Sequence, residues 1–162
     1  MATPRSLGAK LVPQPDSRTW TCALNAFAVA SGVGYRALQA TIGHDGAEVI
    51  NREVNTCDRY RGFTDGELIQ ALWRLGYPVV TILCEGMNAA AKLKWREAAF
   101  PHNYVLYFER QTGGLHAVAC QGKQCVDISG KIESVEDIDV EKIIAIYYIV
   151  KGTECQNAGH TA

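Results

Sequence analysis

The last third of the chain is a series of short β-rich runs, and this feature most constrains the fold. The runs are NYVLYFER, GLHAVACQ, QCVDIS and IIAIYYIV, with turn residues between them. The earlier part of the chain carries mainly helical patterns instead. Helices first and antiparallel strands after them is an α+β order. We therefore expect an α+β domain with a mostly antiparallel sheet near its C-terminus.

Helical signals before that sheet are clear at three places. Residues 22–31 are apolar on nearly all sides, which predicts a buried helix that Gly32 ends. A short helix, YRALQATI, follows. Thr64 and Glu67 have the spacing of a capping box at the start of DGELIQALWRLG. We expect YPVVTILC to be a strand, NAAAKLKWREAA a helix, and the polar residues 43–62 a long irregular loop.

Length and charge limit the kinds of protein. The 162 residues fit a single domain, 1–162, with flexible ends at 1–11 and 151–162. A net charge of −1 without long runs of one sign argues against a nucleic-acid surface and a membrane anchor. No apolar stretch approaches the ~20 residues of a membrane helix, and the N-terminus lacks a secretory apolar centre. We expect a cytoplasmic protein and leave its oligomeric state open.

Six cysteines raise the question of disulfides and metals. They lie at positions 22, 57, 84, 120, 125 and 155. The chain is longer than a typical disulfide scaffold and rich in core-forming residues, so reduced thiols are expected. Cys120 and Cys125 are the only two close in sequence, and no second Cys or His pair stands at zinc spacing. We expect neither metal nor cofactor, and buried thiols rather than a cross-strand disulfide at Cys120 and Cys125.

The GK dipeptide inside GLHAVACQGKQCVDIS predicts a hairpin and its register. A two-residue loop with glycine first suits a type II′ turn, which places Cys120 opposite Cys125 and His116 opposite Ser129. Side chains alternate between faces along a strand. His116 and Asp127 then share a face as diagonal neighbours about 7–8 Å apart at the backbone. A register slip of one residue would separate them.

Cys22 stands where the buried helix begins. The unpaired N–H groups and the dipole of a helix N-terminus favour a thiolate. A nucleophilic cysteine also needs a histidine to take its proton and a third group to orient the imidazole. His116 lies 94 positions after Cys22, a separation typical of a Cys/His site. The sequence therefore predicts a catalytic set of Cys22, His116 and Asp127; the alternative is that each has only an ordinary structural role.

These residues resemble those of papain-like cysteine peptidases, most closely the double-glycine (bacteriocin-processing) type. The matching features are Gln14, TCALNAFAVA, LHAVA and CVDIS, in the order Gln, Cys, His, Asp, and the resemblance spans about residues 12–150. It implies a papain-like fold with the Cys22 helix packed on the C-terminal sheet. It also implies that Gln14 joins the Cys22 N–H in an oxyanion hole. The chain departs from the family at Ala23, where glycine is usual.

The resemblance implies a stand-alone hydrolase that cleaves a peptide or isopeptide bond in a peptide or protein through a thioester. Two alternatives stay open. The same residues can deamidate glutamine or transfer an acyl group, because a thioester reacts with water or with an amine. The fold can also serve as a non-catalytic binding module, for example in a host-directed effector. For catalysis we expect Cys22 Sγ within about 4 Å of one His116 ring nitrogen and Asp127 at the other.

Overall fold

The computed structural model describes residues 21–51 and 59–150. The predicted flexible ends, 1–11 and 151–162, lie outside the described residues, as do Gln14, Cys57 and Cys155. Within the described ranges, none of the helices has the length and apolar character needed to cross a bilayer.

Among the described residues, the four α-helices and eight strands follow the order predicted from the sequence, with three short strands added. The helices are α1 (Cys22–Ser31), α2 (Tyr35–Ile42), α3 (Asp65–Arg74) and α4 (Ala89–Ala98). The strands are β1 (Val49–Asn51), β2 (Arg59–Tyr60), β3 (Val79–Leu83), β4 (Asn103–Glu109), β5 (Leu115–Gln121), β6 (Gln124–Val126), β7 (Ile132–Ser134) and β8 (Ile143–Ile149). A 3₁₀ turn, η2 (Val135–Asp137), follows β7.

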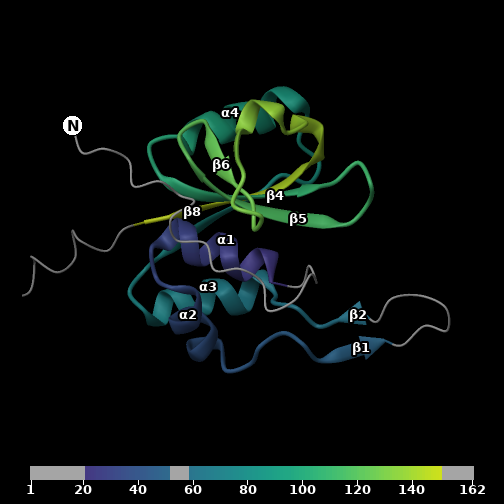
Figure 1. Ribbon diagram of the computed structural model, residues 1–162. Coiled ribbons are helices and arrows are strands. Elements are labelled where there is room, and N and C mark those ends of the chain that lie inside the picture. The colour runs from purple at the N-terminus through teal and green to yellow at the C-terminus, as the bar shows by residue number, and fades with distance from the viewer. Residues whose placement is uncertain (1–20, 52–58, 151–162) are drawn as a thin grey trace, which may run out of the picture.

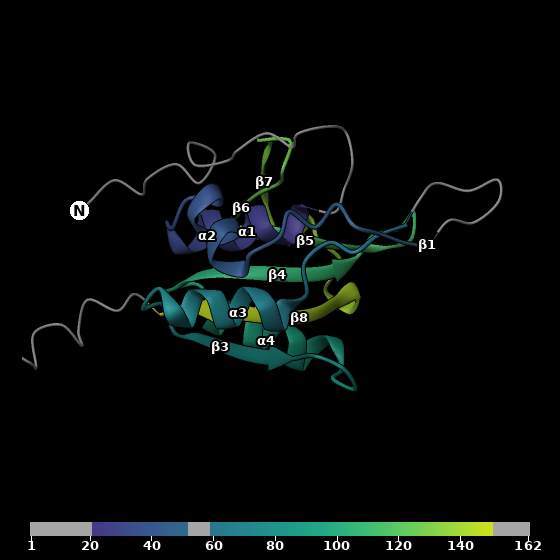
Figure 2. The same ribbon diagram turned by 90° about the horizontal axis from the view of Figure 1, so that it is seen from below.

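A six-stranded sheet divides the molecule into layers. Its strand order is β3-β8-β4-β5-β6-β7, and every neighbouring pair is antiparallel. Helices α1, α2 and α3 lie on one side of the sheet and α4 on the other (Figure 1). Seen from the three-helix side, α1 lies near β5 and α3 nearer β3 (Figure 2). The architecture is mixed α/β with an antiparallel main sheet, which agrees with the predicted α+β order.

Helix α1 lies inside the domain. All residues from Ala23 to Ser31 are buried, as the all-round apolar pattern predicts. The ring of Phe27 packs against Tyr107 of β4 and Tyr147 of β8, with centroids 6.3 and 5.3 Å away. Gly32 ends the helix with φ 75°, a left-handed conformation that glycine adopts without strain. The sheet therefore holds the start of α1 in a fixed place.

The predicted capping box of α3 is confirmed. The Thr64 hydroxyl accepts the Glu67 N–H at 3.2 Å, and the Glu67 carboxylate accepts the Thr64 N–H at 3.0 Å. The expectation of an irregular loop over 43–62 was wrong in part, because β1 and β2 pair within it. The polarity of this segment hid a short β-forming run, VIN, whose partner lies eight or more positions later.

The predicted hairpin register is also confirmed. Cys120 pairs with Cys125, and Gly122 opens the loop with φ 57°. The ladder ends at Val126, however, and the Gly130 N–H bonds back to the Asp127 carbonyl at 2.8 Å. Ser129 therefore lies in a turn, and its predicted pairing with His116 was wrong. The chain turns here because β7 returns to pair with β6.

Candidate active site

His116 is the second residue of β5, at an end of the strand that β6 does not reach. The ladder between β5 and β6 covers only Ala119–Gln121, so the turn after β6 lies beside His116 instead. The imidazole is 5% exposed. Its ring meets the Phe108 ring of β4 edge-on, with centroids 5.6 Å apart. The histidine is therefore held in an apolar wall with its polar atoms turned toward the neighbouring loops.

Asp127 is the first residue after β6 and accepts a hydrogen bond from His116. Its Oδ1 lies 2.8 Å from His116 Nε2 and also accepts the Ile128 N–H at 2.6 Å. A carboxylate can only accept, so Nε2 carries the hydrogen and Nδ1 is the acceptor nitrogen of a neutral ring. Burial raises the pKa of Asp127, but the His116 bond and charge, the Ile128 N–H and Arg110 outweigh it, and the pKa falls below its usual range.

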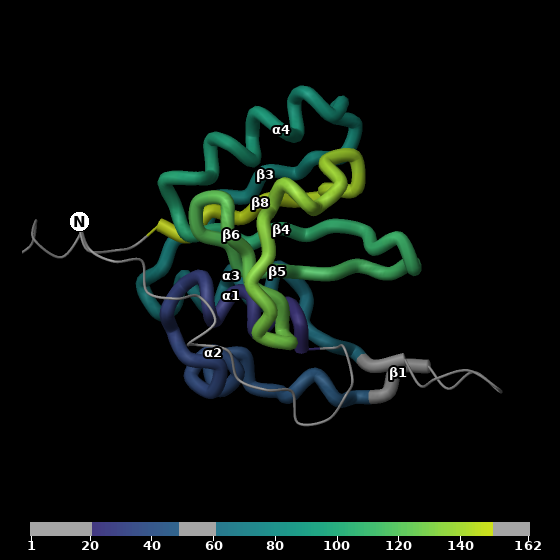
Figure 3. Tube along the Cα trace, turned by 45° about the horizontal axis from the view of Figure 1, so that its top comes forward, coloured from purple at the N-terminus to yellow at the C-terminus, as the bar shows by residue number. Residues whose placement is uncertain are grey.

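Cys22 is the first residue of α1 and the third polar neighbour of the imidazole. The start of α1 lies beside the turn that follows β6 (Figure 3). Burial alone lowers the pKa of His116. Hydrogen bonds with Asp127 and with the Cys22 thiol, and the charges of these two groups, more than offset this effect, so the pKa lies above its usual range. The structure thus brings Cys22, His116 and Asp127 together.

The helix end at Cys22 presents no capping side chain from the described residues. Thr21 occupies the N-cap position but makes no side-chain hydrogen bond to the first turn. A helix start without an acidic residue or a hydroxyl cap keeps its N–H groups available for another negative charge. The first turn of α1 contains no acidic residue.

Arg110 belongs to the site and was missed from the sequence. It follows β4, and its N–H bonds the Gly114 carbonyl at 3.0 Å to close the β4–β5 turn. Its Nη2 lies 2.9 Å from Nδ1 and 2.8 Å from Nε2 of His116, and 3.8 Å from Asp127 Oδ2. One signal for this role was available in the sequence. Arg110 is a cationic residue directly after β4, and β4 pairs with β5, the strand that carries His116.

Two tyrosines lie beneath Cys22 on the helix side of the sheet. Tyr107 has a buried hydroxyl without a partner among the described residues. Burial, and then the nearby Tyr147, Cys22 and Asp65, raise its pKa, so the phenol stays protonated. The Tyr147 hydroxyl donates to Asp65 Oδ2 at 2.8 Å. This network links the start of α3 to the sheet under the site.

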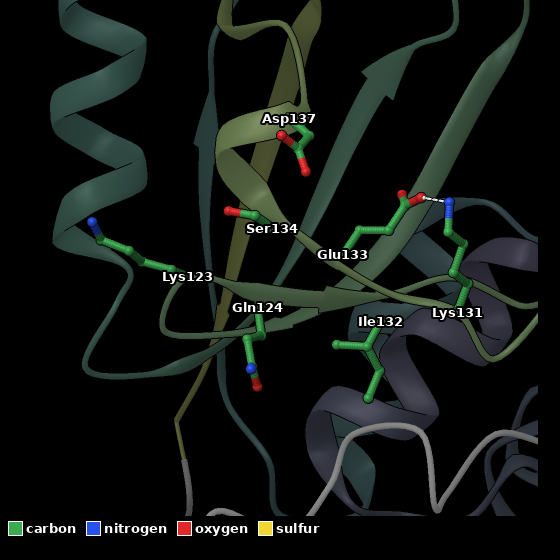
Figure 4. A pocket seen from close by; sticks show the side chains of 7 residues that line it. All are labelled: Lys123, Gln124, Lys131, Ile132, Glu133, Ser134 and Asp137. Carbon is green, nitrogen blue, oxygen red and sulfur yellow. Dashed lines mark ion pairs between the residues drawn. The ribbon is translucent and has the colours of Figure 1, made fainter.

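Two hollows flank the turn that carries Asp127. One, of about 420 Å³, is lined by Phe108, by Arg110 and the two residues after it, and by Asp137 of η2. The other lies along β7, where Lys131 pairs with Glu133 (Figure 4). Both share Glu133 and Asp137, and their volumes are those of ligand sites. Neither is lined by Cys22 or His116, so they adjoin the candidate site and do not contain it.

Metal chemistry finds no support among the described side chains. Over 21–51 and 59–150, no group of three or more His, Cys, Asp or Glu residues is arranged to hold a metal ion. The polar groups that converge are a thiol, an imidazole, a carboxylate and a guanidinium. That set can move a proton from sulfur to nitrogen and stabilise the resulting ion pair.

Comparison of the chain with protein-family models and with curated proteins finds no match. The resemblance to papain-like peptidases therefore rests on the residues quoted above alone.

Proposed function

We propose that this protein is a cysteine hydrolase that cleaves a peptide or isopeptide bond of a peptide or protein substrate. The observation that carries the proposal is one imidazole that lies near two groups. His116 Nε2 lies 2.8 Å from Asp127 Oδ1, and the Cys22 thiol at the start of α1 lies close enough to the same ring to help raise its pKa. A cysteine-bearing buried helix packed on an antiparallel sheet also supports a papain-like fold for this domain.

The reaction begins with proton transfer from Cys22 Sγ to His116 Nδ1. The thiolate then attacks the substrate carbonyl carbon, and the imidazolium returns its proton to the leaving amine as the C–N bond breaks. Water next attacks the thioester while His116 takes one of its protons, and the acid product and the thiol are released. Asp127 holds the Nε2–H throughout, which fixes the tautomer and stabilises the imidazolium.

Oxyanion stabilisation is part of the proposal. The Cys22 backbone N–H is one donor, and the resemblance to the peptidase family supplies the Gln14 side chain as the other. Each such donor is commonly worth ~3 kcal/mol in the transition state. The cytoplasm is the proposed compartment, because a reducing environment keeps the reactive thiol free.

The first test is the pH dependence of iodoacetamide labelling, with each cysteine followed by peptide mass spectrometry. Cys22 should label rapidly well below pH 8.5, the ordinary thiol pKa. In His116→Ala the rate should fall at least about tenfold because the proton acceptor is lost. His102→Ala, which removes an exposed histidine, is the matched control and should not change the rate. Labelling of Cys22 only after unfolding would contradict the proposal.

Hydrolysis itself is tested on a peptide library read by mass spectrometry. New termini should appear with the wild-type protein and be absent with Cys22→Ala. Glutamine converted to glutamate, or peptides joined to an added amine, would assign the acyl-enzyme to deamidation or transfer instead. A reactive thiol that produces none of these products would favour the binding-module alternative.

A further inference from the structure

The guanidinium of Arg110 lies within hydrogen-bonding distance of both nitrogens of the His116 ring. Its Nη2 is almost equally distant from both ring nitrogens, at 2.9 and 2.8 Å. The in-plane directions of the two nitrogens diverge, so one atom cannot lie in line with both. The contact therefore brings a positive charge close to both nitrogens of the imidazole rather than to one of them alone.

We propose that Arg110 is a positioning residue that holds the His116–Asp127 pair and weakens the binding of a proton to His116. This inference rests on the proposed cysteine hydrolase. Arg110 reaches both members of the pair, since the same Nη2 lies 3.8 Å from Asp127 Oδ2 while Oδ1 binds the imidazole. The two carboxylate oxygens thus face different partners, which keeps Oδ1 turned toward Nε2.

Within the described part of the chain, the charged and titratable groups facing the imidazole come from three elements. Cys22 comes from the start of α1, Asp127 from the end of β6, and Arg110 from the β4–β5 turn. Phe108, from β4, contributes an apolar edge. Asp127 and the thiolate favour the imidazolium, whereas a positive charge in contact disfavours it. Arg110 is therefore the one group in this set that opposes protonation by its charge.

A nearby positive charge that disfavours the imidazolium is useful for a histidine that must later donate its proton. The pKa of His116 already lies above its usual value, and an imidazolium that is too stable donates poorly to a leaving amine. General acid–base catalysis works best when the pKa of the group lies near the working pH. Because the ring is buried, solvent screens the Arg110 charge less than it would at an open surface. Arg110 thus keeps His116 usable both as a base and as an acid.

The experiment is an NMR titration of the ¹⁵N-labelled imidazole of His116. Arg110→Gln and Arg110→Met both remove the charge, and the methionine keeps an apolar stem in place. Each should raise the pKa of His116 by about one unit, and Arg110→Lys should change it less. Arg74→Gln, which removes an exposed charge from α3, is the matched control and should have no effect. His44 and His102 serve as references in the same spectra.

The direction of the shift separates an electrostatic role from a purely structural one. If Arg110 only closed the β4–β5 turn, its loss would open the site, and the raised pKa of His116 would fall back toward 6.5. An unchanged or lower pKa in both neutral variants would overturn the inference. Cys22 labelling on the same samples tests the proposed function separately. A Cys22 that is inert in every variant ends the hydrolase proposal, whereas a reactive Cys22 with an unshifted His116 ends the Arg110 inference alone.

Discussion

Exposure separates Cys22 from the other cysteines that the structure describes. Cys84 and Cys120 are 0% exposed and Cys125 is 2% exposed, whereas Cys22 is partly accessible. Burial raises the pKa of Cys84 and of Cys120, which makes both thiols poor nucleophiles. Accessibility, a helix start and a histidine partner coincide only at Cys22 within this set.

Replacing Cys22 and Cys84 by alanine should have opposite effects. Cys22→Ala should abolish hydrolysis and change the free energy of unfolding by less than about 0.5 kcal/mol, because the site is partly exposed. Cys84→Ala should leave hydrolysis intact and cost about 1 kcal/mol, because it opens a small void in the core. Urea unfolding and the peptide assay measure both. Loss of the fold in Cys22→Ala would instead identify a structural cysteine.

For single residues, the sequence predicts the positions of some members of the candidate site and not of others. The approach of His116 and Asp127 was predicted from the GK loop and strand alternation, and Asp127 still follows that alternation because it lies only one residue beyond the end of β6. The position of Ser129 does not follow, because alternation holds only while a strand lasts and β6 ends at Val126. The contact of Arg110 with His116 could not be predicted from the sequence, because it depends on the direction of a long, flexible side chain at a turn.

One carboxylate joins helix α3 to the segment before it. Glu67 Oε2 completes the capping box with Thr64, while its Oε1 accepts from His44 Nε2 at 3.0 Å and from Arg61. The His44 ring stacks on Phe63, with centroids 5.0 Å apart. The cap thus stabilises both the helix and the chain that leads into it.

Thr64→Ala should lower the free energy of unfolding by about 1 kcal/mol, the usual effect of losing an N-cap. The Glu67 N–H would lose its acceptor, while the contacts of Glu67 with His44 and Arg61 would remain. Thr41→Ala is the matched control, because the Thr41 hydroxyl bonds only within α2 and is exposed. Equal unfolding midpoints in urea for the two variants would show that the cap contributes little.

The strand order of the whole domain depends on pairings between strands that are distant in sequence, and local sequence patterns do not reveal these pairings. Hairpin neighbours such as β4 with β5 follow from short turns, but β3 pairs with β8, more than sixty positions later. Periodicity predicts that a run is a strand and not which strand lies beside it. The α+β class was therefore accessible from the sequence, whereas the strand order was not.

The site should make the stability of the whole molecule depend on pH. Asp127, with its pKa lowered from 3.8, contributes above that value, and its contribution disappears as the pH falls through the lowered pKa. His116, with its pKa raised from 6.5, contributes fully below that value and loses this contribution as the pH rises through the raised pKa. The pair should stabilise the fold most between these two ordinary values.

Asp127→Asn should therefore be most destabilised, by about 2 kcal/mol, between about pH 4 and 6.5, with a smaller difference from wild type on either side. Urea unfolding at several pH values measures this difference. Asp137→Asn removes an exposed carboxylate near the same turn and is the control. A constant difference across the range would mean that the ion pair adds nothing beyond a neutral hydrogen bond.

The central place of β8 has a consequence for the newly made protein. This strand is the last of the sheet in sequence, yet it lies between β3 and β4. A ribosome adds about 5–20 residues per second, so on the order of ten seconds separates the synthesis of Cys22 from that of Ile149. During this interval β3 and β4 lack the strand that joins them, and for most of it His116 does not yet exist. The Cys22 thiol is therefore without its proposed proton acceptor for most of translation, and the proposed reaction would have to wait until the fold closes.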